Sequence, residues 1–208
     1  IPDTVTYKDV KYPVTSFSQL AFQDAAEIES VTIPSTIKEI ESSAFWRCSG
    51  LKKVVIPPSV TTIGVSAFFG CSGLKTLYIP KSVRQIGNSA FNGCGFTNIT
   101  VDPANPVYDS RENSNAIIET ETNTMLVASS STVIPASVTE LDDYVFSGVK
   151  RLEHLEIPGN VRKIGWHCFS ESGIKSIRIN SNLVYSMETF NNSTSLEEVE
   201  YGPDATEI

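Results

Sequence analysis

The sequence lacks the features that mark nucleic-acid-binding and membrane-spanning proteins. Its 208 residues carry 16 Lys and Arg against 24 Asp and Glu, a formal net charge of −8 at pH 7. A partner with a phosphate backbone requires a basic face, so nucleic-acid binding is excluded. No stretch approaches the ~18 apolar residues of a membrane helix, so this segment is not expected to insert into a membrane. The chain begins at Ile1 rather than Met, and we expect a leading segment, such as a signal peptide, to be absent from it.

Catalytic and phosphate-binding motifs are scarce as well. Only two histidines occur, His154 and His167, and neither belongs to a Gly-x-Ser-x-Gly or His-Glu-x-x-His motif. The glycines Gly64, Gly87 and Gly165 recur at one position of a repeat and do not form a loop that cradles phosphate. We therefore expect no enzyme activity and no cofactor, and a Ser–His–Asp site assembled only in space is the alternative. His154 is expected to point outward from a strand, and His167 to be a surface side chain.

What the chain does contain is a repeat of 23 residues. Its clearest copy, residues 51–73, follows the template Leu-x-x-Val-x-Ile-Pro-x-Ser-Val-x-x-Ile-Gly-x-x-Ala-Phe-x-x-Cys-x-Gly. A fixed period in this range is typical of a solenoid, in which each repeat is one supersecondary unit. The template proline recurs at this step, with one interruption, in Pro34, Pro57, Pro80, Pro135 and Pro158.

The pattern within one repeat predicts its local structure. Apolar residues alternate around Val54 and Ile56, which predicts a strand that Pro57 ends. Residues 60–63 predict a second short extended piece, and residues 67–71 fit one helical or 3₁₀ turn. A single repeat buries too few side chains to offset a backbone ordering cost of about 1–2 kcal/mol per residue, so repeats must stack. The predicted fold is α/β, a solenoid with one parallel sheet and one strand per repeat. The strand residues expected to be buried in register are Val54, Leu77, Ile99, Leu155 and Ile177.

The repeat divides a single expected domain, residues 1–208, into four stretches. The first contains a lone strand at residues 5–10, and terminal repeats of a solenoid are atypical because one face meets water. In order, the stretches are an N-terminal cap with a degenerate repeat (1–27), regular repeats (28–101), an insertion (102–131), and regular repeats with a truncated last copy (132–208).

The insertion separates the strand position Val101 from its next equivalent, Ile134. Two apolar runs around a polar turn predict a β-hairpin from Asn115 to Ala128, apart from the main sheet and dispensable for folding. The loop from Asp102 to Asn115 has oxygen-bearing side chains at a density typical of calcium sites. It lacks the Asp-x-Asp order of a tight cation loop, and a solvated turn is the alternative.

Three of the four cysteines, Cys48, Cys71 and Cys94, share one repeat position. We expect a ladder of buried free thiols, because Cys behaves as a small hydrophobic residue. Adjacent rungs about 5 Å apart leave a disulfide bond as the alternative. Cys168 lies one residue before Phe169, at the alanine position of its repeat, and is expected in the core. A zinc site is rejected because it needs convergent Cys and His ligands, whereas a ladder spreads them along an axis.

The template resembles the BspA-type leucine-rich repeat of bacterial surface proteins, whose signature is Leu-x-x-Ile-x-Ile-Pro-x-Ser-Val-x-x-Ile-Gly-x-x-Ala-Phe-x-x-Cys. The Asn-Pro-x-Tyr stretch at residues 105–108 and the hairpin insertion add to the resemblance. It implies a right-handed leucine-rich-repeat solenoid in a secreted or surface-anchored recognition or adhesion protein. The implied partner is a host protein, a matrix component or a glycan. A structural spacer that holds other domains away from the cell is the alternative.

The outward positions of the predicted strands form a strip that is the candidate binding face, and a merely solvated face is the alternative. Tyr and Arg dominate binding energy at interfaces, so Tyr78 and Arg178 are the expected anchors. Because they lie four repeats apart, the partner that touches both must be an extended polypeptide or polysaccharide. The residues predicted to bind it are Lys53, Val55, Tyr78, Thr100, His154, Glu156 and Arg178.

Overall fold

The computed structural model describes residues 1–185, 188–203 and 205. They fall into two compact units, each of which is described by itself. Unit 1 comprises Ile1–Cys94 and Val101–Pro106, and unit 2 comprises Gly95–Thr100 and Val107–Ile208. The single domain expected over residues 1–208 stays a prediction.

Unit 1 begins with a β-hairpin and not with the lone strand expected at residues 5–10. Strands β1 (Thr4–Tyr7) and β2 (Val10–Pro13) pair antiparallel. Lys8 and Asp9 between them have positive φ values of 49° and 61°, the backbone that a tight two-residue hairpin turn requires. All residues of both strands are exposed, so the hairpin adds nothing to the core.

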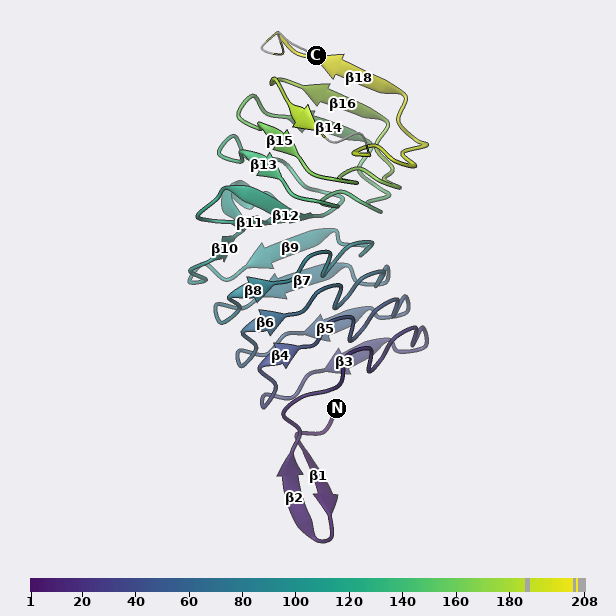
Figure 1. Ribbon diagram of the computed structural model, residues 1–208, viewed down its shortest axis with the longest axis vertical. Coiled ribbons are helices and arrows are strands. Elements are labelled where there is room, and N and C mark those ends of the chain that lie inside the picture. Colours follow the sequence, from purple (N-terminus) through teal and green to yellow (C-terminus); the bar gives the residue numbers. More distant parts are fainter. Residues whose placement is uncertain (186–187, 204, 206–208) are drawn as a thin grey trace. The chain divides into compact units, whose positions relative to one another are not determined.

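The rest of unit 1 is a stack of coils with two short parallel ladders (Figure 1). Both ladders keep the full repeat step between coils, as in the pairs Thr32–Val55 and Glu39–Thr62. The coils approach so closely that a Cβ on Gly64 would lie 2.6 Å from Ser42 N, which explains the glycine of the template. The strands of the coils in unit 1 are β3 (Ser30–Thr32), β4 (Glu39–Ile40), β5 (Lys53–Val55), β6 (Thr62–Ile63), β7 (Thr76–Ile79) and β8 (Gln85–Ile86).

Residues 67–71, predicted as a helical turn, belong to the turn segment of their coil. In this segment the backbone N–H groups donate alternately within the coil and to the next coil. Ala67 N donates to Gly64 O within its own coil at 3.2 Å, whereas Phe68 N donates to Ala90 O of the next coil at 2.7 Å. In an α-helix every interior N–H would stay within the segment. The stacking of coils therefore takes every second donor away from the helical pattern.

Backbone dihedral angles exclude a helix at the same place. Ser66 and Gly70 have positive φ values of 54° and 72°, far from the right-handed helical region. Within the described ranges, the 3₁₀ segment Arg111–Asn113 is the only helix. The α/β class and the short helical turns are therefore wrong, and so is the expectation of one strand per repeat. Each unit is a β-solenoid of stacked coils.

A column of phenylalanine rings forms the core of unit 1. Phe22, Phe45, Phe68 and Phe91 stack with centroid separations of 5.0, 5.1 and 5.5 Å and nearly parallel planes. Phe45 and Phe68 are fully buried. The repeat step thus becomes a physical stack, because equivalent rings in neighbouring coils lie on top of one another.

The predicted cysteine ladder runs through the same core. Cys48, Cys71 and Cys94 are buried free thiols, and each Sγ–H points at a phenylalanine carbonyl of the preceding coil, at 3.0, 3.1 and 3.2 Å. Cys168 of unit 2 is also buried and free, as expected. Burial raises the pKa of the Cys94 thiol and of the Cys168 thiol, which keeps both protonated at neutral pH.

We expect the four thiols to resist alkylation by iodoacetamide in the native protein at mildly alkaline pH and to react fully in guanidinium chloride. The thiolate is the nucleophile, and burial denies the reagent access to all four sulfur atoms. Mass spectrometry of the alkylated chain measures the number of modified thiols. Fewer than three reactive thiols under denaturing, non-reducing conditions would contradict the free ladder, and rapid native labelling would contradict its burial.

Unit 2 contains one mixed sheet and one parallel sheet. The mixed sheet has the strand order β10-β11-β12-β13-β15-β17, and the parallel sheet has the order β14-β16-β18 (Figure 1). The chain enters through β9 (Asn98–Val101). The strands of the two sheets are β10 (Tyr108–Asp109), β11 (Ala116–Glu119), β12 (Thr124–Ala128), β13 (Glu140–Leu141), β14 (His154–Ile157), β15 (Lys163–Ile164), β16 (Ser176–Ile179), β17 (Val184–Tyr185) and β18 (Glu198–Tyr201).

The hairpin predicted from Asn115 to Ala128 is confirmed, and it lies apart from the parallel sheet β14-β16-β18 as expected, but it is not separate from the core. Strands β11 and β12 pair antiparallel, and β12 then pairs in parallel with β13, the first regular strand after the insertion. Ile117, Ile118 and Met125 are fully buried. The hairpin is therefore part of the core of unit 2 and not a dispensable insertion.

The expected burial of the strand residues is correct at four of five positions. Leu77, Ile99, Leu155 and Ile177 are 6% exposed or less, and Leu155 pairs with Ile177 in register. Val54 is only half-buried, which corrects the expectation for that strand. The alternation places the intervening residues of each strand on the outer face, where the candidate binding residues were predicted.

Candidate functional site

Three of the predicted binding residues lie on the outer faces of strands in unit 1. Lys53 and Val55 lie on β5, and Tyr78 lies on β7. Val55 and Tyr78 are 54% and 52% exposed, which leaves two large apolar surfaces open to a partner. The sequence pattern alone placed them correctly, because strand side chains alternate between two faces.

Tyr78 is held in place by a carboxylate. Its hydroxyl donates to Asp102 Oδ2 at 2.7 Å, and Asp102 Oδ1 accepts from Ala104 N at 2.9 Å. The hydrogen bond to Asp102 raises the pKa of Tyr78, and the bond from Tyr78 lowers the pKa of Asp102. A ring with a fixed orientation loses less conformational freedom when it meets a partner.

Two carboxylates of the loop between Asp102 and Asn115, those of Asp102 and Asp109, accept hydrogen bonds from protein donors. Asp109 accepts from Arg111 Nε at 2.8 Å, from Arg111 Nη2 at 2.6 Å and from Thr120 Oγ1 at 2.9 Å. Burial raises the pKa of Asp109, but the hydrogen bonds from Arg111 outweigh it and lower that pKa. Within the described ranges, no group of three His, Cys, Asp or Glu residues is arranged to hold a metal ion.

In unit 2 the parallel sheet lines up charged residues across its strands. Glu156, Arg178 and Glu200 pair in register across β14, β16 and β18. Arg178 Nη1 lies 3.8 Å from Glu200 Oε2, and Asn180 Nδ2 donates to Glu156 Oε1 at 2.7 Å. A second row on the same face lies two residues earlier in each strand. It begins with His154, whose Nδ1 lies 2.7 Å from Ser176 Oγ.

A third row lies just before the three strands. Lys175 Nζ lies 2.9 Å from Glu153 Oε2, and Glu197 N donates to Lys175 O. The hydrogen bond from Lys175 lowers the pKa of Glu153, so that carboxylate stays charged at neutral pH. Strand alternation does not place this row on the outer face, where the carboxylates of Glu156, Glu198 and Glu200 outnumber the one permanent cation, Arg178. We name this outer surface the acidic face, and its residues are His154, Glu156, Ser176, Arg178, Glu198 and Glu200.

The structure brings together only some of the predicted residues. Glu156 and Arg178 are direct neighbours in register, and His154 lies on the same face. Thr100 is exposed on β9, which belongs to unit 2 up to that residue. Whether these residues form one continuous strip with Tyr78 of unit 1 stays a prediction.

Sequence reasoning missed an aromatic cluster on the turn segments of unit 2. The Tyr144 ring stacks on His167 with centroids 5.4 Å apart, and Trp166 meets both rings edge-on. Glu188 joins the cluster, because Trp166 Nε1 donates to Glu188 Oε2 at 2.8 Å and His167 Nε2 lies 3.0 Å from the same atom. His167 has only 15% of its side chain exposed, so its expected surface position is wrong. The signal was the bulky pair Trp166 and His167 where other repeats have small residues.

A serine, a histidine and a glutamate also form a hydrogen-bonded row in this cluster, but the row is not arranged for nucleophilic attack. Ser170 is 6% exposed, and its hydroxyl donates to Asn191 O at 2.7 Å. His167 Nδ1 lies 2.7 Å from Ser170 Oγ, and it must be the donor there because the serine proton is already used. A catalytic serine would instead donate its proton to the histidine and be open to a substrate.

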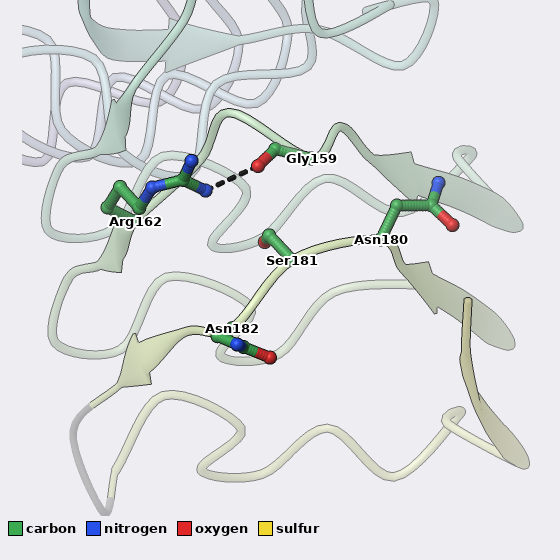
Figure 2. Close-up of a pocket in the computed structure, with 5 residues that line it drawn as sticks. All are labelled: Gly159, Arg162, Asn180, Ser181 and Asn182. Carbon is green, nitrogen blue, oxygen red and sulfur yellow. Dashed lines mark hydrogen bonds between the residues drawn. The ribbon is translucent and has the colours of Figure 1, made fainter. Parts of the chain in front are cut away.

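A polar pocket of about 380 Å³ opens between two loops of unit 2 (Figure 2). Arg162 lies on one side with its guanidinium directed at the carbonyl of Gly159, and the segment from Asn180 to Asn182 forms the other side. Among the described residues, none of those that line the pocket is a carboxylate. It is distinct in charge from the acidic face.

Stacked parallel coils with alternating buried and exposed strand positions define a repeat solenoid, a class of proteins that bind partners on extended surfaces. The chain belongs to the family of the BspA type leucine-rich repeat region, which it matches in six copies over residues 4–110 and 121–208. The resemblance of the template to this repeat is thereby confirmed. No curated protein sequence matches the chain.

Solved structures of bacterial proteins share the fold. A leucine-rich repeat protein from Bacteroides ovatus is 26% identical, with a TM-score of 0.56 over 97% of this chain and 68% of its own. The pneumococcal vaccine antigen PcpA is 18% identical, with a TM-score of 0.54 over 99% of this chain and 78% of its own. One from Eubacterium ventriosum is 17% identical, with a TM-score of 0.52 over 89% of this chain and 70% of its own. Across the described ranges, no helix has the length and apolar character needed to cross a membrane.

Proposed function

We propose that this chain is a non-catalytic recognition module, secreted or displayed at a bacterial cell surface, that binds an extended protein through its outward strand faces. Membership of the BspA type repeat family supports the surface location and the interaction role. The partner is proposed to carry a basic segment, and it can be host-derived. A polysaccharide partner and a spacer role are the outcomes that the experiment below distinguishes.

The observation that carries this proposal is the register of the acidic face. The strand spacing sets Glu156, Arg178 and Glu200 side by side, and the ion pair holds Arg178 between the two carboxylates. Exposed pairs of this kind contribute little to stability, so their alignment is not explained by folding. Carboxylates on either side of Arg178, two strands apart, match a polypeptide with several Lys or Arg residues, and charge complementarity mainly accelerates association.

Replacing Glu156 and Glu200 together with glutamine is expected to weaken binding of the partner about tenfold, mostly through slower association. Glutamine keeps the size of both side chains and removes only their charge. An array of matrix proteins, lysine-rich peptides and glycans identifies the partner, and surface plasmon resonance at two salt concentrations measures the rates. Glu29→Gln is the matched control, because Glu29 is an exposed acid of unit 1 in an ion pair with Lys52.

Equal weakening by the control, or binding that does not depend on salt, would contradict a charge-steered interface on the acidic face. Tyr78→Ala then shows whether the same partner reaches unit 1, where that ring is 52% exposed and held by Asp102. Neither substitution should lower the melting temperature, because all the altered side chains are exposed. A chain that binds nothing on the array favours the spacer.

A further inference from the structure

The pocket in Figure 2 arises from a shortened loop. Residues 158–162 connect β14 to β15, whereas only residues 180–183 connect β16 to β17 in the next coil. The strand pairing agrees with this difference in loop length. Lys163 and its partner Val184 are fewer residues apart in the sequence than His154 and its partner Ser176. In unit 1 the two ladders keep one common step, so the loops between them keep one length. The shorter loop in unit 2 leaves a hollow beside the loop of Arg162.

The sequence departs from the template at the same place. The Ile-Pro step of the regular coils becomes Ile-Asn here, and Asn180, Ser181 and Asn182 replace the Pro-x-Ser segment. These three residues line the hollow together with Gly159 and Arg162. A local break in a strongly repeated pattern, without a gain in packing, is expected at functional positions.

The chemistry of the lining is that of a hydrogen-bond donor site. Ser181 is 4% exposed, yet its Oγ has no hydrogen-bond partner among the described residues. A buried hydroxyl without a partner destabilises the free protein, and a ligand acceptor removes that penalty. Figure 2 shows this hydroxyl on the side of its loop that faces Arg162.

Arg162 supplies the charge of the pocket. Its Nη1 donates to Gly159 O, which fixes the guanidinium at the rim, and the residue is exposed. The acids on the adjoining strands have protein partners, since Glu140 pairs with Lys163 and Glu156 accepts from the side chain of Asn180, itself a lining residue. A guanidinium binds carboxylate or phosphate through paired hydrogen bonds, which makes Arg162 the group that selects an anion.

We infer that this pocket binds a small oxyanion-bearing ligand, with Arg162 on the anionic group and the Ser181 hydroxyl donating to a ligand oxygen. A volume of about 380 Å³ accommodates one sugar ring, so the carboxylate of an acidic sugar and a free phosphate group share the required chemistry. The inference does not rest on the acidic face or on its partner.

Titration of the protein with glucuronate, inorganic phosphate and glucose, followed by amide chemical shifts in NMR, tests the site. We expect dissociation constants in the millimolar range for glucuronate or phosphate, with shifts concentrated at residues 159–162 and 180–182, and no binding of glucose. Saturation by glucuronate alone identifies the acidic sugar as the source of the anion, and saturation by phosphate alone identifies the phosphate group. Either result supports an anion pocket.

Arg162→Gln is expected to weaken the binding at least tenfold. Arg84→Gln is the matched control, because Arg84 stands at the equivalent repeat position in unit 1 and also donates to the carbonyl of a preceding loop residue, Lys81. Ser181→Ala is expected to weaken binding about threefold to tenfold without lowering the melting temperature, since the removed hydroxyl has no partner among the described residues of the free protein. Equal losses in Arg162→Gln and Arg84→Gln, equal binding of glucose, or no shifts with either anion would overturn the inference.

Discussion

Phe68→Ala is expected to lower the free energy of unfolding of unit 1 by about 3–5 kcal/mol. Phe68 is fully buried and stacked between Phe45 and Phe91, with centroid separations of 5.1 and 5.5 Å. Truncation removes one ring from the middle of the column and leaves a cavity that two flat neighbours cannot fill. Urea unfolding monitored by circular dichroism measures the loss.

The adjacent residue supplies the control for this substitution. Phe69 is half-buried and meets the edge of Trp46, with centroids 6.1 Å apart. Phe69→Ala removes the same number of atoms and is expected to cost less than about half as much, because its site opens to water. Similar losses for the two variants would show that the ring column is not the main source of stability in unit 1.

Deleting residues 115–128 and joining the flanking segments is expected to abolish cooperative unfolding of unit 2. The deletion removes β11 and β12, which carry the fully buried Ile117, Ile118 and Met125. It also strips the partner strand from β13, which leaves both an open edge and an exposed apolar face. Thermal unfolding by circular dichroism, together with binding of a hydrophobic dye, reports the collapse of the unit.

The N-terminal hairpin is the matched control for this deletion. Removing residues 1–12 takes away β1 and most of β2, strands in which all residues are exposed. We expect the melting temperature to change little, because a two-stranded hairpin without a buried face contributes little stability. A cooperative transition retained after deletion of 115–128 would return that hairpin to the status of an insertion.

The candidate site was predictable only in part. Strand alternation indicates which residues face outward, and it correctly placed Tyr78, Glu156 and Arg178 on exposed strand positions. It does not indicate that Arg178 forms an ion pair with Glu200. Alternation gives the face on which a side chain lies, whereas the contact between two long side chains depends on their rotamers in the stacked coils.

The pocket and the aromatic cluster illustrate the same limit. Asn180 and Ser181 stand out as departures from the template, but a hollow follows only when one loop is stacked beside a longer one. The Tyr144, Trp166 and His167 rings come from the turn segments of two successive coils, and stacking of the coils brings them into contact. The repeat pattern shows that such residues are unusual, but it does not predict which of them come into contact.

The sequence by itself determined the repeat, the family, the strand before the Ile-Pro step in most coils, the buried cysteine ladder and the existence of the hairpin between Asn115 and Ala128. Each of these depends on side-chain size and on short-range periodicity, which are visible in one dimension. Only the tertiary structure decided that the turn segments are not helical and that the hairpin belongs to the core. In the turns, neighbouring coils take every second N–H, as Phe68 N does with Ala90 O, and a donor can satisfy the next coil or its own helix but not both.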